Sequence, residues 1–132
     1  MNQIRFLTYA EILLIHQDQL VKFGGDTGLR DSGLLSSALA MPESSYSGNY
    51  LHETIFDMAS AYLFHLCQNH PFVDGNKRVG LASALIFLDL NHIEIDDPEE
   101  KLFELTMKVA TGLCKKTEIA ECLKKLSDKF NQ

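Results

Sequence analysis

The chain has 132 residues, of which 45% are hydrophobic and 23% are charged, so it can build one hydrophobic core and lies far from the composition of disordered proteins. Its 12 basic and 18 acidic residues give a formal charge of −6, which argues against direct nucleic-acid binding and against binding to anionic membranes. The three cysteines show no C-x-x-C spacing, and no apolar run is long enough for a signal peptide or a membrane span, so we expect a cytoplasmic protein with reduced thiols.

The apolar residues recur with helical periodicity along nearly the whole chain, and no repeat or linker divides it, so we expect a single domain over residues 1–132. A Thr-x-x-Glu capping box at Thr8 predicts a first helix that runs to about Phe23 and stops at two glycines. Asp31 is the expected N-cap of a second helix through Ala40, which a proline then ends.

The next segment, residues 42–52, has no consistent apolar face and predicts an exposed loop that carries two tyrosines. A third helix is expected from about Glu53 to Asn69, because its apolar residues recur at the spacing of one buried face. These residues are Phe56, Ala59, Leu63, Leu66 and Cys67.

A fourth helix should span residues 76–90, and because it is apolar on nearly every side we expect it to be the central helix of the bundle. Residues 93–95 are at most a short extended piece. The sequence Asp-Pro-Glu-Glu at residues 97–100 predicts a helix start with an aspartate N-cap and a proline in the first helical position. That helix should end near Gly112, and a last one should span residues 117–130. The prediction is an all-α fold of about six helices packed around one buried central helix.

Polar groups that suit phosphate chemistry are concentrated between the third and fourth predicted helices, in the sequence His-Pro-Phe-Val-Asp-Gly-Asn-Lys-Arg at residues 70–78. The main-chain N–H groups of Asn76, Lys77 and Arg78 would open a helix, where unpaired donors and the helix dipole favour an anion. Two cations in that first turn oppose the dipole, which is unfavourable for stability alone but favourable beside a polyphosphate.

The other residues of this segment fit the same chemistry. Asp74 supplies a hard oxygen ligand for Mg²⁺, which usually accompanies phosphate. His70 can accept a proton from an attacking hydroxyl, as histidine does in general base catalysis. Gly75 lets the backbone approach a bound nucleotide closely, and Phe72 should point into the core and anchor the loop.

Each of these features has an ordinary structural explanation when it is taken singly, as a cap, a turn or a solvated pair of cations. Their grouping in nine residues favours a catalytic site. The other histidines are assigned no role in it: His65 should pack or cap a helix, and His16, His52 and His92 have no neighbouring ligand pattern. Paired Cys/His spacing is absent as well, so we do not expect a zinc enzyme.

Residues 70–78 resemble the signature of the Fic/Doc family, and specifically of its Doc (death-on-curing) toxin branch. The glycine-rich block at residues 24–31, with the Leu-Leu-x-Ser-Ala that follows, is similar to the N-terminal block of the family, and residues 110–112 are similar to its C-terminal end. The resemblance implies the Fic fold and a role for each motif residue. These roles are catalytic base for His70, metal ligand for Asp74, core anchor for Phe72, and phosphate binding for Asn76, Lys77 and Arg78.

The adenylylating members of this family have a glycine where this chain has Lys77 and an arginine where it has Leu81. A lysine fills the space in which a diphosphate would lie along the loop, so the nucleotide should lie the other way and present its terminal phosphate. The resemblance therefore implies a Doc-like toxin that uses ATP and Mg²⁺ to phosphorylate a protein hydroxyl, on a threonine of translation elongation factor Tu, and thereby arrests translation. Gly75 matches the adenylylating pattern, so AMP transfer is the alternative, and a non-catalytic helical binding module is a second alternative.

Many Fic proteins carry their own inhibitory helix of the form [Ser/Thr]-x-x-x-Glu-[Gly/Asn]. The closest match here, from Thr117 to Glu121, is followed by Cys122 and fails at the last position. The resemblance thus implies inhibition in trans by an antitoxin protein. One hypothesis is that a segment of this antitoxin lies over residues 42–52 and the motif.

Overall fold

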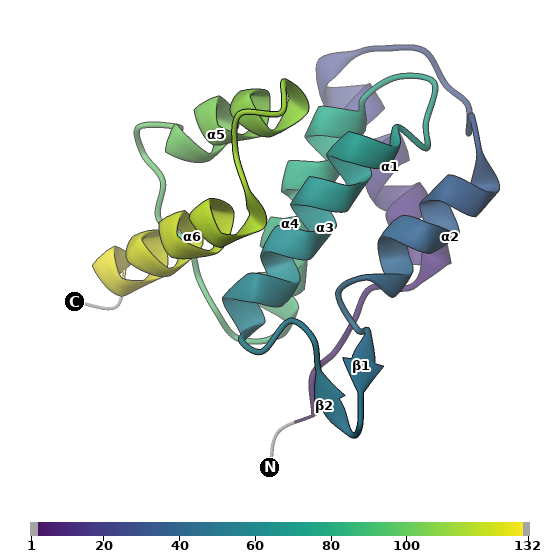
Figure 1. Ribbon diagram of the computed structural model, residues 1–132. Coiled ribbons are helices and arrows are strands. Elements are labelled where there is room, and N and C mark those ends of the chain that lie inside the picture. The colour runs from purple at the N-terminus through teal and green to yellow at the C-terminus, as the bar shows by residue number, and fades with distance from the viewer. Residues whose placement is uncertain (1–2, 131–132) are drawn as a thin grey trace.

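Six helices and one short hairpin make up the computed structural model, which describes residues 3–130 (Figure 1). The predicted all-α fold is confirmed. The helices are α1 (Tyr9–Phe23), α2 (Ser32–Ala40), α3 (Ile55–Asn69), α4 (Asn76–Leu90), α5 (Lys101–Ala110) and α6 (Lys116–Phe130), and the hairpin strands are β1 (Ser45–Tyr46) and β2 (Asn49–Tyr50).

Two helices begin with a capping box. Helix α1 has the predicted one, in which Thr8 accepts from the main chain of Glu11 and the Glu11 carboxylate accepts from the Thr8 N–H. Helix α3 has a second one between Thr54 and Asp57, which the sequence analysis missed. Because a capping threonine satisfies first-turn N–H groups, α3 begins directly after Thr54 and two residues later than expected.

Helix α5 begins at Lys101, three residues after the predicted start. Pro98 and Glu99 form a turn instead of the first helical positions. The N-cap is Glu100, in the left-handed conformation and without a side-chain cap, so the prediction of Asp97 as N-cap was wrong. The Asp97 carboxylate nevertheless satisfies the first turn, because it accepts from the N–H groups of Lys101 and Leu102, both at 2.9 Å.

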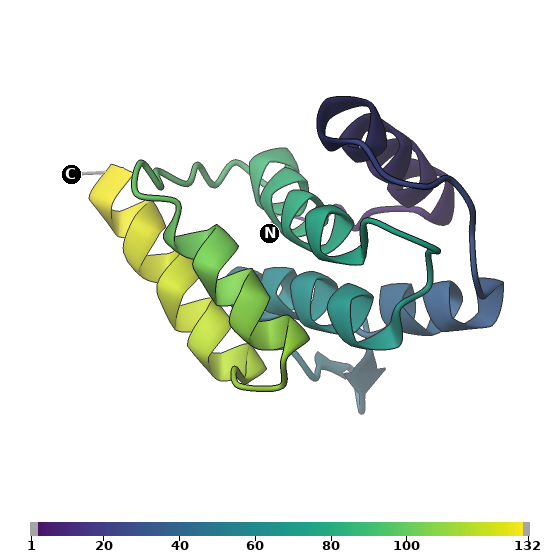
Figure 2. The same ribbon diagram turned by 90° about the horizontal axis from the view of Figure 1, so that it is seen from above.

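The middle of the bundle is occupied by α3, whereas the sequence predicted α4 there. Helix α3 packs against α2, α4, α5 and α6, and α4 packs against α1, α3 and α5 (Figures 1 and 2). Helix α4 has apolar residues on every side, but other elements do not cover every side. Ile86 is 37% exposed, and Leu81 and Leu85 are half-buried. Gly80 lets the two helices approach closely, because a Cβ there would lie 3.1 Å from the carbonyl oxygen of Leu63.

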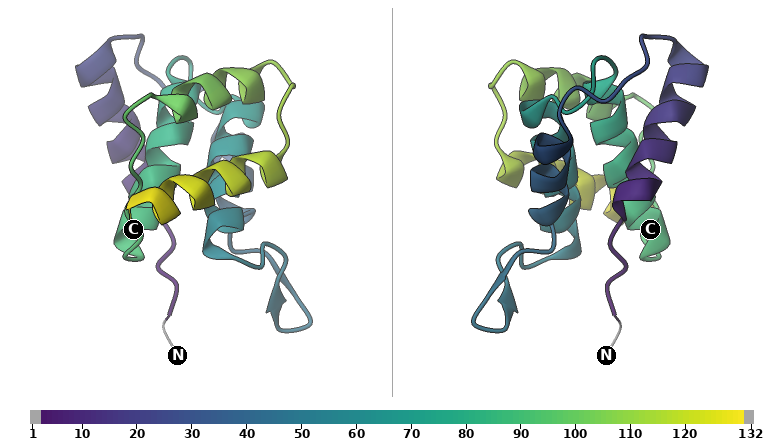
Figure 3. Two further views of the ribbon diagram at one scale, coloured as in Figure 1. Left: turned by 90° about the vertical axis from the view of Figure 1, so that its left-hand side faces the viewer. Right: turned by 90° about the vertical axis from the view of Figure 1, so that its right-hand side faces the viewer.

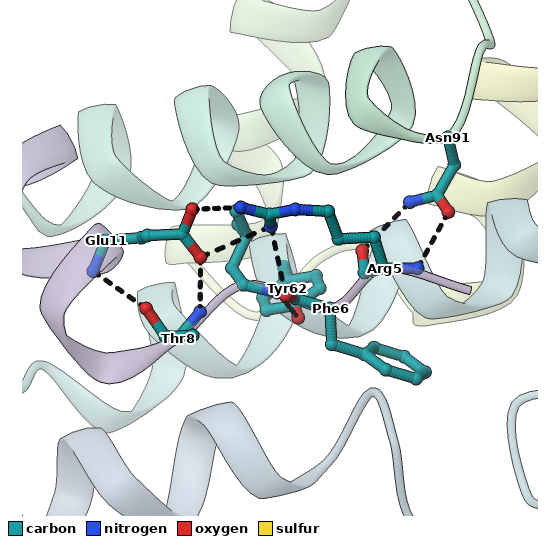
Figure 4. A network of polar contacts seen from close by, with 7 residues as sticks. Arg5, Phe6, Thr8, Glu11, Tyr62 and Asn91 are labelled. Atoms are coloured by element: carbon teal, nitrogen blue, oxygen red, sulfur yellow. Dashed lines mark hydrogen bonds and ion pairs between the residues drawn. The ribbon is translucent and has the colours of Figure 1, made fainter. Parts of the chain in front are cut away.

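The chain before α1 is fixed across the end of α4 by a polar network (Figure 4). The main chain of Arg5 donates to and accepts from the side chain of Asn91, at 2.9 and 3.0 Å. The Arg5 guanidinium binds Glu11 at 2.6 Å and holds the pKa of that carboxyl down at about 2. The buried hydroxyl of Tyr62 accepts from the Leu7 N–H at 2.9 Å. Helix α1 is thus held in place relative to α3 and α4.

Residues 42–52 contain the hairpin, which the sequence analysis described only as an exposed loop. Its six residues are exposed as expected, and Ser47 and Gly48 both have positive φ, as a tight two-residue hairpin turn requires. The hairpin projects from the N-terminal end of α3 (Figures 1 and 3). The motif follows the C-terminal end of that helix, roughly 22 Å away at 1.5 Å per residue.

Two expectations about the class of protein can be compared with the structure. Cys67, Cys114 and Cys122 are free thiols, as predicted, and the first two are buried. Within residues 3–130, none of the helices combines the length and the apolar character needed to cross a membrane.

The ammonium group of Lys116, at the start of α6, lies between two imidazole rings. Its Nζ is 3.1 Å from Nε2 of His52 and 3.0 Å from Nε2 of His65. Both ring nitrogens must accept, because an ammonium group only donates. Burial, with the Lys116 charge and the neighbouring His52, lowers the pKa of His65 to about 4. Two neutral rings therefore help to hold α6 against α3.

We predict that acid destabilises the wild-type protein more than a His65→Gln variant, which keeps an acceptor for Lys116 but does not titrate. The pKa of this histidine is 6.5 when unperturbed and about 4 in the folded chain, so between these values the unfolded chain binds a proton that the folded chain does not. Stability is therefore complete above this window and falls as the pH falls through it. The free energy of unfolding, measured in urea at both ends of this pH window, should fall further in wild type than in His65→Gln, by on the order of 1 kcal/mol. Equal losses would contradict the prediction.

Candidate functional site

The connection between α3 and α4 begins and ends with a residue in the left-handed conformation. His70, the C-cap of α3, has φ 49°, and Gly75, the N-cap of α4, has φ 79°. This conformation is uncommon for a residue other than glycine and needs support from its surroundings. Arg30 supplies it, because its guanidinium donates to the carbonyl oxygens of His70 at 2.6 Å and Asn69 at 3.0 Å.

The segment between α1 and α2 lies alongside this connection as its main support. The carbonyl oxygen of Pro71 accepts from the N–H groups of Arg30 and Asp31, at 2.7 and 3.0 Å, and that of Gly28 accepts from Val73 at 3.0 Å. The glycine-rich block that the sequence analysis noted therefore has a structural task. It fixes the path of the backbone that carries the motif.

Asn76 holds the two ends of the connection together with its side chain, which is only 6% exposed. Its Oδ1 accepts from the Phe72 N–H at 3.0 Å, and its Nδ2 donates to the Phe72 carbonyl at 3.0 Å. The same Nδ2 lies 3.2 Å from Nδ1 of His70. Phe72 is 2% exposed and anchors the loop in the core, as predicted from its position. The side-chain amide of Asn76 is therefore engaged within the loop, which leaves its main-chain N–H as the group that could meet a ligand.

The ring of His70 is exposed and lies beside the start of α4 through this contact. The Asn76 amide donates there, so Nδ1 accepts and a neutral ring carries its proton on Nε2. No hydrogen bond joins Nε2 to a residue within 3–130. The ring can accept a proton from a substrate once it exchanges this contact, and such rearrangement on substrate binding is common at catalytic hydrogen bonds.

The carboxylate of Asp74 faces solvent and is held by two main-chain donors. Oδ2 accepts from Asp26 at 3.0 Å and Oδ1 from Gly75 at 2.8 Å, and these bonds keep the pKa of Asp74 below its usual value. Gly25 allows this approach, because a Cβ at that position would lie 2.9 Å from Oδ2. The side chain is thus ionised, oriented and accessible.

This donor set fits Mg²⁺ that arrives with a nucleotide. Each Asp74 oxygen has only one hydrogen bond, so lone pairs remain for a cation. Among residues 3–130 no three acidic, histidine or cysteine side chains gather into a metal cage. Mg²⁺ commonly takes one or two carboxylates and completes its shell with phosphate oxygens and water.

The first turn of α4 presents free donors. No side chain caps the helix at Gly75, and no residue in the described part of the chain accepts from the main-chain N–H groups of Asn76, Lys77 and Arg78. These three groups and the positive end of the helix dipole are the features that a candidate anion seat requires.

A hollow of about 340 Å³ lies over this turn. A hollow of about 620 Å³ near Arg5 and Asn91, at the other end of α4, is larger but lacks free helix N–H groups, so chemistry rather than size selects the site. His70 does not line the smaller hollow and lies across the connection from it. The lining residues are Phe23, Gly24, Asp74, Gly75, Asn76, Lys77, Arg78, Phe103 and Met107.

Two aromatic rings that the sequence did not indicate lie against Arg78. Its guanidinium carbon is 4.0 Å from the ring centre of Phe23 in α1 and 4.5 Å from that of Phe103 in α5. These two cation–π contacts fix the guanidinium beside the first turn of α4. Neither ring is near the motif in sequence, so no local pattern could have indicated this contact.

His16 is a second residue of the site that the sequence analysis missed. It comes from α1, is 5% exposed, and stacks on Phe72 with ring centres 3.7 Å apart and planes 8° from parallel. Its Nε2 lies 2.7 Å from the carbonyl oxygen of Asp74. The one indication of this role in the sequence is that His16 is a polar residue on the otherwise apolar buried face of α1.

Comparisons with known proteins agree with this geometry. A family model described as the Fic/DOC family matches residues 6–88. The chain is 37% identical over 102 residues to Toxin Doc of Mycolicibacterium smegmatis, covering 76% of this chain and 78% of the relative. It is 28% identical over 123 residues to Protein kinase doc of Escherichia phage P1, covering 93% of this chain and 96% of the relative.

We predict that Asn76→Ala destabilises the fold by about 1–3 kcal/mol, because it leaves the buried N–H and carbonyl of Phe72 without partners. The neighbouring Lys77→Ala variant is the matched control, since that side chain is exposed and its removal should change stability by less than about 0.5 kcal/mol. Urea unfolding measures both. If Asn76→Ala loses no more stability than Lys77→Ala, the Asn76 side chain does not hold the loop.

Proposed function

Because the chain belongs to the Fic/DOC family, we propose that it is a Doc-like toxin enzyme that transfers a phosphoryl group from ATP to a hydroxyl of a protein target. The observation that carries the proposal is the start of α4, where three unpaired N–H groups lie beside Lys77, Arg78 and the exposed carboxylate of Asp74. Free donors, two cations and a hard oxygen ligand together suit a polyphosphate with its metal ion.

Each residue has a separate task in this proposal. The N–H groups of the first turn, the Lys77 ammonium and the Arg78 guanidinium bind phosphate oxygens. Mg²⁺, held by Asp74, would neutralise charge on the phosphates. His70 accepts the proton of the target hydroxyl while a bond forms from that oxygen to the terminal phosphorus and the bond from phosphorus to ADP breaks. The contact between Asn76 Nδ2 and His70 Nδ1 supports this role, because it ties the ring to the residue whose main-chain N–H opens the proposed phosphate seat.

Lys77 favours phosphoryl transfer over AMP transfer. Its side chain is exposed and lines the hollow over the free N–H groups. An ammonium there occupies the room that a diphosphate would need to run along the loop, and it attracts the end of the nucleotide with the most negative charge. AMP transfer is the second candidate, because Gly75 matches the pattern of the adenylylating members of the family.

The proposed target is a threonine of elongation factor Tu, in the cytoplasm, so that modification arrests translation. Inhibition is proposed to act in trans, by an antitoxin protein. The segment from Thr117 to Glu121, which matches the inhibitory-helix pattern imperfectly, lies far from the motif. Thr117 and Glu121 line a hollow at the N-terminal end of α3, whereas the motif follows the C-terminal end of that helix. An antitoxin segment that covers both the hairpin and the motif would have to run the length of α3.

We predict that label from the γ-phosphate of ATP, and not from the α-phosphate, appears on the target protein. The matched control is His70→Asn, because asparagine tolerates the left-handed conformation of this residue and cannot serve as the base. It should lower transfer by about 10²–10⁴-fold. Transfer of the α-phosphate would establish the adenylyltransferase alternative. A wild type that transfers neither and is as harmless on expression as His70→Asn would favour the binding module.

We further predict that Mg²⁺ tightens ATP binding to wild type but no longer does so in Asp74→Asn. The asparagine oxygen can still accept a main-chain hydrogen bond, but the charge that attracts the cation is lost. Titration calorimetry with and without Mg²⁺ should show a difference of about tenfold or more, because interactions with charged groups contribute about 1.5–3 kcal/mol. Asp89→Asn, an exposed carboxylate at the far end of α4, is the control. An equal effect of Mg²⁺ on both variants would exclude Asp74 as the ligand.

A further inference from the structure

His16 has a hydrogen bond whose geometry goes beyond packing. The carbonyl oxygen of Asp74 can only accept, so Nε2 of His16 must carry the proton and donate across the 2.7 Å contact. The ring is fixed from the other side, because it lies flat on Phe72, and it is almost fully buried. A donor with so little freedom fixes the direction of the carbonyl group that it binds.

The direction of this carbonyl determines the direction of the next N–H. The peptide between Asp74 and Gly75 is trans, so its carbonyl and its N–H point to opposite sides. With the carbonyl turned toward α1 and His16, the Gly75 N–H points the other way and donates to Oδ1 of Asp74 at 2.8 Å. One hydrogen bond from α1 thereby reaches the carboxylate that is proposed to bind metal.

This peptide is the weak point of the connection. Gly75 has no side chain and adopts left-handed and right-handed conformations with little difference in energy, so the peptide before it can rotate. A rotated peptide would place a carbonyl oxygen where the N–H now lies. It would remove one of the two donors that hold Asp74 and put a partial negative charge beside the free N–H groups of α4.

We propose that His16 is a positioning residue that locks the Asp74–Gly75 peptide in the orientation that supports the Asp74 carboxylate and keeps the start of α4 open to an anion. The identity of the ligand in this inference rests on the proposed function. The fixed orientation of the peptide rests on the loop geometry alone. His16 touches neither the nucleotide seat nor the reacting groups, and it acts through the main chain of the motif.

Two variants separate the hydrogen bond from the packing. His16→Phe keeps a flat ring against Phe72 but has no donor. His16→Gln keeps an N–H donor at a similar reach but has no ring. If the residue only fills space, the phenylalanine variant should behave like wild type. If it locks the peptide, the glutamine variant should be the better replacement.

The experiment measures three quantities on wild type and both variants: the affinity for Mg-ATP by calorimetry, the hydrogen exchange of the Gly75 amide by NMR without ligand, and the stability in urea. We expect His16→Phe to weaken Mg-ATP binding by about tenfold, as for the loss of one buried hydrogen bond, and to speed exchange at Gly75. His16→Gln should stay within about threefold of wild type in both quantities.

A His16→Phe variant with wild-type affinity and wild-type exchange at Gly75 would overturn the proposal. Equal losses in the two variants, in step with their losses of stability in urea, would also overturn it. Failure of the proposed function looks different, because wild type would then not bind Mg-ATP. In that event the hydrogen-exchange rate of the Gly75 amide still tests whether His16 holds the peptide.

Discussion

Three main-chain N–H groups at the start of α4 have no protein partner among residues 3–130, although contacts from other elements hold the backbone that carries them. Helix starts normally satisfy such groups with the side chain of the N-cap residue, and here the N-cap is a glycine. The two neighbouring side chains that could cap are engaged elsewhere, because Asn76 binds the main chain of Phe72 and Asp74 accepts from the loop after α1. Water can satisfy these free donors, and under the proposed function a phosphate takes its place.

The rigidity of this seat comes from other parts of the chain. Helix α1 contributes His16 under the loop and Phe23 against Arg78, the segment after α1 pairs with Pro71, and α5 adds Phe103. The position of α1 depends in turn on the network around Arg5 at the far end of α4 (Figure 4). The motif residues are therefore held by elements that do not belong to the motif.

The sequence predicted those features that depend on neighbouring residues. Capping chemistry and apolar spacing located the helices, and the grouping of polar residues directed attention to the connection between α3 and α4. Features that depend on distant residues were missed or wrong. Periodicity showed that α4 is apolar on every side but could not show which sides are covered, so α3 was not recognised as the central helix. The sequence also did not show that the buried side chain of Asn76 holds the main chain of Phe72. His16 and the rings around Arg78 come from other helices, and no local pattern connects them to the motif.

The position of the hairpin has a practical consequence for labelling this protein. Its tip, at Ser47 and Gly48, is exposed, and it lies at the end of α3 remote from the motif (Figures 1 and 3). Exposed tips of this kind accept inserted sequence more readily than packed elements do. An affinity tag or a dye-bearing peptide spliced between these two residues would therefore report on the protein without crowding the phosphate seat.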